Sequence, residues 1–540
     1  MDVSFGTVWE AFARELPDAT AVSEPGRDYS YAEFEERSAR LAAALADAGV
    51  GPGDKVACYL YNGAAYLETV FAAFKLGAVP VNVNYRYTSE ELFALLADAD
   101  AAAMVFSGEL AGNVTGIAAR LPSLRLLVRV GAVRAAGDSG PDAAELEELL
   151  AAHAPRPAQP RPGSDEIFMY TGGTTGKPKG VIWRLSDLMH SMEVSVFQRL
   201  GVTTLPGTLD EAVRVAADAR SAGRSPVMMP AVPLMHATGL FNSMGALLAG
   251  GRVVTARPGR LDPRHVWETV AAQRVRTLVV AGNAVCQPLV DELVAAERAG
   301  RPHDLSSLDS VVSSGTVLSD RLKRALHQRA SVTITDAIAS SEGGPFAYAV
   351  TSSVDDLPAR FFPAAPTKVL AGDNPVAPGS GQVGVLAFGG PIPLGYYKDS
   401  AKTTATFRVV DGVRYTMPGD LAVVEQDGAI RFLGRGAGVI NTGGEKVHPQ
   451  EVEDALLTHP DVTDASVVGV PDETWGERVM AVVATSSTAL TAAELRDAVR
   501  SRLAGYKVPR GIVLLPSLPR TPAGKLELAE VRRIAAAEGG

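Results

Sequence analysis

The sequence predicts an α/β fold with largely parallel sheets, a β-rich subdomain and a small α+β domain at the C-terminal end. Short apolar segments that suit strands alternate with amphipathic helical segments up to about Gly381. From there the pattern changes to short strands separated by turns. Because 540 residues exceed what one hydrophobic core accommodates, we expect a large domain over residues 1–434 and a small one over residues 435–540.

The first elements are predicted from hydrophobic periodicity. A short hairpin precedes a helix headed by Tyr31, because Phe34 and Leu45 fall on one helical face. The Gly-Pro-Gly-Asp sequence at 51–54 ends this helix. Ser89 offers an N-cap for a later helix. These patterns predict strands at 55–61, 79–84 and 102–107 and helices at 64–77 and 89–100.

The alternation continues after a proline-rich connector at 155–163. Residues 166–170 are apolar and β-prone, which predicts a buried strand that ends at a glycine-rich loop. Further strands are predicted at 252–256, 276–282 and 307–315, within 381–390, 413–420 and 421–435, and at 465–471, 478–486 and 510–516, with a helix at 491–505.

The glycine-rich loop runs from Thr171 to Gly180 and contains four glycines, three threonines and two lysines. Glycine lets backbone N–H groups turn inward, threonine adds hydroxyl donors and lysine adds positive charge, which suits a polyphosphate. The spacing differs from the GxxxxGK[ST] loop, because only three residues separate Gly172 from Gly176 and Pro178 follows the first lysine. Composition alone fits a flexible surface turn equally well.

Composition excludes several classes of protein. With 51 Lys and Arg against 61 Asp and Glu, the net charge is −10, and no basic block favours nucleic-acid binding. The two cysteines, Cys58 and Cys286, lie far apart in apolar segments, which indicates core residues in a reducing compartment. We therefore expect a cytoplasmic protein without a disulfide.

No membrane segment is expected. The N-terminal residues contain an early acid and no apolar core, unlike a signal peptide. Residues 227–251 contain no Asp, Glu, Lys or Arg, but Pro230, Pro233 and several glycines interrupt them. A buried strand, loop and helix therefore fit this segment better than a membrane span.

Polar residues with chemical potential follow several of the predicted strands. His236 lies in a Pro-Leu-Met-His-Ala-Thr-Gly sequence, and Ser313-Ser-Gly-Thr316 ends a strand. Residues 336–342 end another strand with two serines and Glu342. Each residue alone has an ordinary structural explanation. The remaining candidates in chain order are Asp420 after a tight turn, Arg435 at the expected domain boundary and Lys525 in the sequence Pro-Arg-Thr-Pro-Ala-Gly-Lys.

This ordered set resembles the adenylate-forming superfamily of acyl-CoA synthetases, luciferases and peptide-synthetase adenylation domains. The similarity covers essentially the whole chain and is closest to the bacterial fatty-acyl-CoA synthetase-like branch. It rests on YTGGTTGKPKGVIWR, SSGTVLS, GVRYTMPGD, INTGGEKVHPQEVE and GYKVPR. The resemblance implies that an organic acid attacks the α-phosphate of ATP, releasing pyrophosphate, and that coenzyme A then displaces AMP.

The resemblance also implies roles for particular residues. Fixed donors, a cation and Mg²⁺ stabilise charge that gathers on the phosphate. Lys525 would contact the carboxylate, Glu342 would bind Mg²⁺ together with Thr174, and His236 would line the acid and pantetheine tunnels. Phosphate, adenine and ribose would be held by Thr171, Gly173, Thr174, Thr175, Gly176, Lys179, Ser314, Gly315, Thr316, Asp336, Ser341, Asp420 and Arg435. Rotation of the small domain would bring Gly443, Gly444, Glu445 and Lys446 to the second step.

Three residues depart from the family pattern. Ile338 and Ala339 stand where relatives often have an aromatic residue and glycine, and Ala437 stands at a hinge position. The methyl group of Ala339 predicts a shorter or differently shaped acid than a long-chain fatty acid. Residues near 236–245, 283–287 and 314–342 are expected to form the pocket walls.

Two alternatives remain open. The activated acid could pass to an amine or carrier, or the enzyme could activate a small oxyacid such as nitrite, without coenzyme A. A noncatalytic nucleotide-binding protein could also keep this fold. We expect ATP, Mg²⁺ and coenzyme A as ligands, a small-molecule acid as substrate, and a monomer or homodimer; the identity of the acid stays open.

Overall fold

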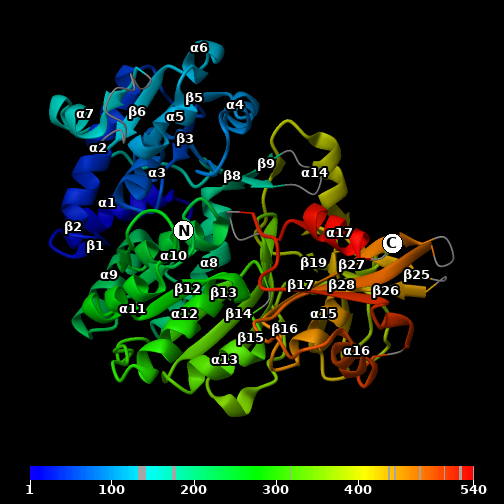
Figure 1. Ribbon diagram of the computed structural model, residues 1–540. Helices are drawn as coiled ribbons and strands as arrows, with labels where there is room; N and C mark the ends of the chain where they lie inside the picture. Colours follow the sequence, from blue (N-terminus) through cyan, green and yellow to red (C-terminus); the bar gives the residue numbers. More distant parts are fainter. Residues whose placement is uncertain are drawn as a thin grey trace.

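The computed structural model describes residues 1–131, 142–172, 178–316, 318–435, 438–442, 445–472, 476–503, 505–521 and 526–538. Its fold is mixed α/β, with large, mostly parallel sheets before a smaller C-terminal region (Figure 1). The helices of the N-terminal half are α1 (Phe5–Glu15), α2 (Tyr31–Asp47), α3 (Ala64–Leu76), α4 (Ser89–Asp98), α5 (Ala111–Val114), α6 (Ile117–Arg120), α7 (Leu146–Ala152), α8 (Leu185–Arg199), α9 (Leu209–Ser221) and α10 (Ala237–Leu248).

Two large sheets form the N-terminal part. The neighbours β3–β4, β3–β5 and β4–β8 of the first sheet are parallel, and so are the five central neighbour pairs of the second sheet. The first has the order β20 (Gly395–Tyr396), β9 (Pro178–Arg184), β8 (Glu166–Gly172), β4 (Val79–Asn82), β3 (Lys55–Tyr59), β5 (Ala101–Ser107), β6 (Leu126–Val130), β7 (Ala144–Glu145). The second has the order β16 (Phe362–Pro363), β15 (Gly343–Thr351), β14 (Thr333–Ser340), β13 (Ser310–Ser314), β12 (Thr277–Val280), β10 (Val227–Pro230), β11 (Arg252–Val254), β1 (Thr20–Glu24), β2 (Arg27–Ser30).

Aromatic side chains of α1, α2 and α3 pack the core between these sheets. Trp9 is fully buried and meets the edge of Phe71 with ring centroids 5.1 Å apart. Phe34 lies 5.2 Å from the same ring. The predicted helical face of α2 is therefore confirmed as a core face. The second sheet is further covered by α11 (Pro263–Ala272), α12 (Gly282–Arg298) and α13 (Asp320–His327).

Helix caps fix the ends of several elements. The hydroxyl of Ser30 accepts from the N–H of Glu33, whose carboxylate accepts from the N–H of Ser30, so α2 begins at Tyr31 as predicted. The expected N-cap at Ser89 is wrong by one residue. Thr88 caps α4, because Glu91 is three residues farther along and completes the reciprocal pair.

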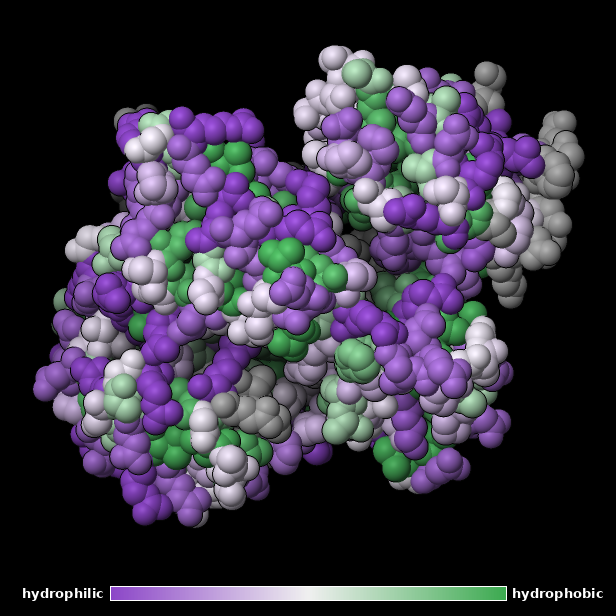
Figure 2. All heavy atoms as spheres, turned by 90° about the horizontal axis from the view of Figure 1, so that it is seen from below, coloured by the Kyte–Doolittle hydropathy of each residue, from purple (hydrophilic) through white to green (hydrophobic). Residues whose placement is uncertain are grey.

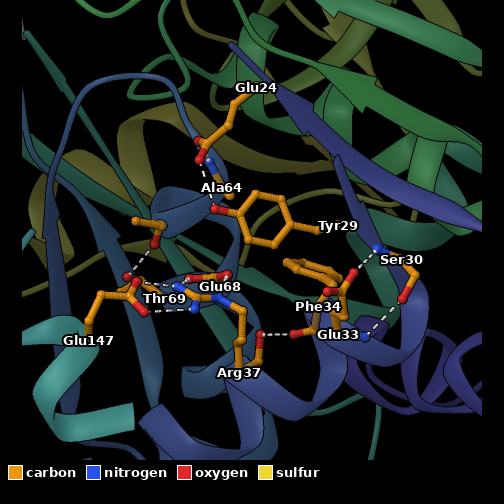
Figure 3. Close-up of polar contacts among 12 residues, drawn as sticks. Glu24, Tyr29, Ser30, Glu33, Phe34, Arg37, Ala64, Glu68, Thr69 and Glu147 are labelled. Atoms are coloured by element: carbon orange, nitrogen blue, oxygen red, sulfur yellow. Dashed lines mark hydrogen bonds and ion pairs between the residues drawn. The ribbon is translucent and has the colours of Figure 1, made fainter. Parts of the chain in front are cut away.

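A polar cluster ties α2, α3 and α7 together (Figure 3). Arg37 donates to the buried carboxylate of Glu68 at 2.5 Å and to Glu147 at 2.7 Å. Tyr29 donates to Glu24, which also accepts from the N–H of Ala64. Burial raises the pKa of Glu68, and the Arg37 guanidinium opposes that shift. Arg37 therefore compensates a carboxylate that would otherwise be buried without a cation.

Residues 227–251 and the two cysteines are ordinary parts of the protein interior. Residues 227–251 contain β10 and α10, and no described helix is long and apolar enough to cross a bilayer. Cys58 and Cys286 are buried free thiols, as expected. On the face shown in Figure 2, hydrophilic residues predominate and hydrophobic ones gather in small groups between them.

The β-rich subdomain begins earlier than predicted, at β17 rather than near Gly381. β17 and β18 form a tight antiparallel hairpin, which the turn-rich sequence did not indicate. Its strands are β17 (Thr367–Ala371), β18 (Asn374–Pro375), β19 (Gly384–Phe388), β21 (Phe407–Val410), β22 (Val413–Thr416), β23 (Asp420–Val424) and β24 (Ile430–Arg435), with α14 (Ser400–Thr406) preceding β21.

A separate sheet forms the C-terminal region, and β28 and α17 lie on the right of Figure 1. Sheet membership changes between β24 and β25. The predicted strands and helix of this region are confirmed. The elements are β25 (Ile440–Thr442), β26 (Glu445–Val447), α15 (Pro449–Leu457), β27 (Asp464–Asp472), β28 (Gly476–Ala484), α16 (Ala492–Arg500), β29 (Gly511–Leu515) and α17 (Leu528–Ala537).

Candidate active site

A cavity of about 1610 Å³ lies where the two large sheets meet. The strands β10, β12, β13 and β14 are parallel, so their carboxyl ends share one edge of the second sheet, and the residues that follow them line the cavity. Crevices at the carboxyl ends of parallel strands are the usual ligand sites of open α/β sheets. Predicted residues at this edge of the cavity are Thr171, His236, Ser314, Gly315, Thr316, Ser341 and Glu342.

The glycine-rich loop is held at its base by a two-stranded ladder. Thr171 in β8 pairs with Lys179 in β9, and Thr171 lines the cavity. The ammonium of Lys179 lies 3.1 Å from the carboxylate of Asp399. The N–H of Lys402 and the Lys179 ammonium both lower the pKa of Asp399. Gly173, Thr174, Thr175 and Gly176 lie outside the described residues.

Asn82 connects this loop to the histidine segment, and sequence reasoning missed it. Its amide oxygen accepts from the N–H of Tyr170 at 2.6 Å. Its amide nitrogen donates to the carbonyls of Tyr170 and Met235 at 3.0 and 2.6 Å. The signal was an asparagine at the end of an apolar strand, where a buried amide needs several partners. Asn82 thus fixes the end of β8 beside the residue that precedes His236.

His236 is the N-cap residue of α10 and lines the cavity. The loop that leads to it is fixed from the first sheet. Asn62 donates to the carbonyl of Val232 and accepts from the N–H of Leu234. The histidine therefore reaches the site through backbone contacts that no local pattern predicts.

Glu342 lies in the turn between β14 and β15 and is buried at the cavity wall. Tyr396, from β20, donates to its Oε1 at 2.8 Å. Trp183 donates its indole N–H to the carbonyl of Ser341 at 2.9 Å and so anchors the same turn. Tyr396 was not among the predicted residues, because it lies 54 positions away. Lys402 lies over the Tyr396 ring at 4.2 Å.

Glu342 is the described residue that the family resemblance assigns to Mg²⁺. The described residues form no cluster of three or more metal-binding side chains. Magnesium commonly takes one or two carboxylates and completes its shell with water and substrate phosphates. Glu342 faces the cavity and satisfies the protein's share of such a shell. Thr174, the second expected ligand, is outside the described residues.

The small polar residues after β13 lie on the cavity as expected. Ser314, Gly315 and Thr316 line it, and Gly315 has a φ of 91° that a residue with a Cβ would adopt only with strain. The hydroxyl of Thr316 donates to the carbonyl of Ala281. These residues form a narrow wall that leaves the backbone accessible.

Asp336 corrects the sequence prediction. Alternate residues of β14, among them Thr335 and Ala337, line the cavity, so Asp336 lies on the opposite face of the strand. Its buried carboxylate is 3.0 Å from the ammonium of Lys323. Burial raises the pKa of Asp336, and Lys323 opposes the shift. Asp336 is therefore an ion-pair partner of Lys323 and is not among the residues that line the cavity.

Asp420 and Arg435 are brought together by register. They are Cα partners in the β23–β24 ladder, and Asp420 is buried beside Pro418 and Gly419, which line the cavity. The side chain of Arg435 is not described. β24, the last strand before the C-terminal sheet, therefore ends beside the cavity.

The C-terminal region reaches the same cavity. Thr521 and Glu527 line it, and they lie on either side of the segment that contains Lys525. Lys525 itself, Gly443, Gly444 and Ala437 are outside the described residues. For Glu445 and Lys446 only the backbone is described, as part of β26.

Ala339 does not close the cavity. It lines the cavity, but the cavity continues along β14 past Ala337 and Thr335 to Thr333. Because these inward residues are small, their side chains leave the face of the sheet open. Of the expected wall segments, residues of all three line the cavity, and α8 and β15 add walls that the sequence did not indicate.

Comparison with known proteins agrees with this architecture. The family model described as "AMP-binding enzyme" matches residues 9–397, and "AMP-binding enzyme C-terminal domain" matches residues 451–525. The anthranilate CoA ligase AuaEII, solved with anthranoyl-AMP, shares the fold with a TM-score of 0.83 at 22% identity, covering 100% of this chain and 98% of that chain.

Curated relatives match over nearly the full length. A 3-oxocholest-4-en-26-oate–CoA ligase of Rhodococcus rhodochrous is 39% identical over 94% of this chain and 92% of its own. A medium/long-chain-fatty-acid–CoA/3-oxocholest-4-en-26-oate–CoA ligase of Mycolicibacterium smegmatis is likewise 39% identical, with the same coverage. The chain belongs to the family of AMP-binding enzymes.

Proposed function

We propose that the protein is an AMP-forming acid–CoA ligase. In the first step a carboxylate oxygen attacks the α-phosphorus of ATP, pyrophosphate leaves, and an acyl-adenylate forms. In the second step the thiolate of coenzyme A attacks the acyl carbon and AMP leaves. The observation that supports this most directly is a single cavity that carries Thr171, His236 and Glu342 and also both flanks of the Lys525 segment.

The residues have complementary roles in the first step. Thr171 and Lys179 stand at the base of the loop that would hold the phosphates, together with Gly173, Thr174, Thr175 and Gly176. Mg²⁺, when bound, neutralises charge on the phosphates. Glu342, with Thr174, holds that ion, and Tyr396 orients the Glu342 carboxylate. Lys525 contacts the substrate carboxylate.

The nucleoside is held by residues of the second sheet and of the β-rich subdomain. Ser314, Gly315, Thr316 and Ser341 border the adenine, and the buried Asp420 accepts the ribose hydroxyls. Arg435, its register partner, contributes to ribose or phosphate binding. These assignments rest on cavity position and motif order.

The second step uses a rotation of the small domain. We place the division of the chain at Arg435, where β24 ends and the C-terminal sheet follows. Rotation about this point carries Gly443, Gly444, Glu445 and Lys446 toward the cavity, while His236 borders the path of the thiol. Closure of the cavity protects the activated acid from water.

An acid panel tests the proposal. Purified protein is assayed for ATP–pyrophosphate exchange with each acid, and AMP release is then measured with and without coenzyme A. The CoA ligase is supported by acid-dependent exchange and by consumption of coenzyme A in step with AMP. Exchange without coenzyme A use would favour the amine, carrier or oxyacid alternatives, and no exchange with any acid would favour a noncatalytic protein.

A further inference from the structure

The acid pocket extends along the whole second sheet. The inward residues of β14 are Thr333, Thr335, Ala337 and Ala339, which follow the two-residue period of a strand. Thr333 and Ala339 are six positions apart in the strand, so this wall is about 20 Å long. The far end lies at the amino edge of the sheet, opposite the edge where Glu342 sits.

One face of α8 covers this wall. Leu188, Met192, Val196 and Arg199 line the cavity at spacings of three or four residues. Trp183, just before the helix, is bonded at the reacting end. Arg199 ends the helix and lies about 16 Å farther along its axis than Leu188. The apolar face of α8 therefore ends at a positively charged residue, Arg199.

The far end of the cavity is polar and carries net positive charge. Its charged side chains are Arg199, Arg224, Arg276 and Asp309, three guanidinium groups against one carboxylate. Tyr348 from β15 also lines the cavity, beside its register partner Ala337, and lies near enough to Arg199 for the two side chains to interact electrostatically. A purely hydrocarbon chain gains nothing from such groups and would pay for displacing their water.

Three of these four charged side chains, Arg224, Arg276 and Asp309, already have partners within the protein. Arg276 lies 2.7 Å from the carboxylate of Asp309, and Arg224 donates to the carbonyl of Leu200 at 2.7 Å. Among the described ion pairs and hydrogen bonds, none involves Arg199. Arg199 is exposed to solvent within the cavity.

The protein that surrounds Arg199 shifts the pKa of its guanidinium group. Burial lowers the pKa of the Arg199 guanidinium, while Tyr348 and Asp309 oppose that shift. Burial likewise raises the pKa of Tyr348 to about 12, so its hydroxyl stays a hydrogen-bond donor at neutral pH. Arg199 from α8 and Tyr348 from β15 therefore present two hydrogen-bond donors to the cavity.

We propose that Arg199 and Tyr348 bind a hydrogen-bond-accepting oxygen at the end of the acid remote from its reacting carboxyl group. The assignment rests on the proposed acid activation and narrows its substrate to long acids with a terminal oxo or carboxylate group. Arg199 is a specificity residue and takes no part in adenylation. Its distance from Glu342 along the sheet selects acids by length as well as by polarity.

Matched acids of one length test this assignment. Three series are compared in ATP–pyrophosphate exchange with the full-length protein: methyl-ended, oxo-ended and carboxylate-ended acids. At the favoured length we expect kcat/KM to be about ten- to a hundredfold higher for an acceptor-ended acid than for the methyl-ended one, the range of a bond to a charged donor. The oxo and carboxylate arms tell a neutral acceptor from an anionic one.

Substitutions of Arg199 and Tyr348 test whether these two side chains cause the preference for acceptor-ended acids. Arg199→Met should remove the preference and leave exchange with the methyl-ended acid unchanged or improved, and Arg199→Lys should restore part of it. Tyr348→Phe should reduce it by about fivefold. Arg214→Met, an exposed arginine on α9, is the matched control and should change nothing.

Three results would overturn the assignment. The first is an equal kcat/KM for methyl-ended and acceptor-ended acids at every length. A loss in Arg199→Met that is the same for all acids is the second, because it would show a merely structural role. No exchange with any acid would remove the proposed function itself, and this assignment with it.

Discussion

Tyr396 donates its hydroxyl hydrogen to Oε1 of Glu342 at 2.8 Å and so joins the edge strand β20 of the first sheet to the β14–β15 turn of the second. Both residues line the cavity. The carboxylate that is proposed to bind Mg²⁺ is therefore oriented by the opposite sheet, and the relative position of the two sheets becomes part of the site.

Tyr396→Phe should lower the rate of adenylation by about five- to tenfold and raise the Mg²⁺ concentration required, because Glu342 loses a buried donor. The measurement is ATP–pyrophosphate exchange over a Mg²⁺ titration. Tyr397→Phe is the control, since the Tyr397 hydroxyl donates to Asp100 at the surface. Equal behaviour of the two variants would contradict the role of Tyr396.

Lys525→Ala should abolish adenylation and leave thioester formation from a supplied acyl-adenylate largely intact. In the proposed mechanism the lysine acts on the carboxylate and phosphate oxygens, which have already reacted before the second step. Both half-reactions are followed separately, by exchange and by acyl-CoA formation. Equal loss in both would exclude the assigned role.

Asn82→Ala should destabilise the protein by about 2–4 kcal/mol and reduce exchange activity more than stability alone explains. The substitution leaves three backbone groups of Tyr170 and Met235 without their partner. Chemical unfolding and KM for ATP are the measurements.

Asn113→Ala is the matched control for Asn82. Its amide donates to Tyr59 and to the carbonyl of Tyr87, and Asn113 itself is not among the residues that line the cavity. It should lose stability without a change in KM. An unaltered KM in Asn82→Ala as well would show that Asn82 is structural only.

Arg37→Met should destabilise the protein by about 3 kcal/mol, because Glu68 would be left as a buried carboxylate without its cation. The exposed pair of Arg120 and Glu90 provides the comparison, and Arg120→Met should cost much less than Arg37→Met, because solvent screens this pair. The midpoints of urea unfolding distinguish the two. Similar values for both variants would contradict the contribution assigned to burial.

Glu453 should make the small domain less stable as the pH rises. Burial raises its pKa from 4.5 to about 8, so the folded state keeps a proton that the unfolded state loses between these values. Its contribution is fully present below about pH 4.5 and is lost as the pH rises through 8.

Glu453→Gln should remove this dependence. The amide oxygen can still accept from the N–H of Val467. The variant should gain about 4 kcal/mol over the wild type between pH 5 and pH 8.5, measured by unfolding of the full chain at both values. A constant difference at both pH values would exclude ionisation of Glu453 as the cause.

Local patterns predicted much of the fold but less of the site. The face of α2, the strand before the loop and the C-terminal strands followed from periodicity, because each is set by residues close in sequence. Motif order correctly brought Thr171, His236 and Glu342 to one cavity. Asp336 was misplaced, because the face on which a strand residue lies depends on the sheet that packs against it.

The sequence by itself determined the α/β class, the order of the chemical motifs and the family to which the chain belongs. Only the tertiary structure decided which residues meet: Tyr396 with Glu342, Asn82 with the loop before His236, and Arg199 with the far end of the cavity. Periodicity records the environment of a residue along its own element. Contacts between elements depend on how sheets and helices pack, and that information is spread over residues hundreds of positions apart.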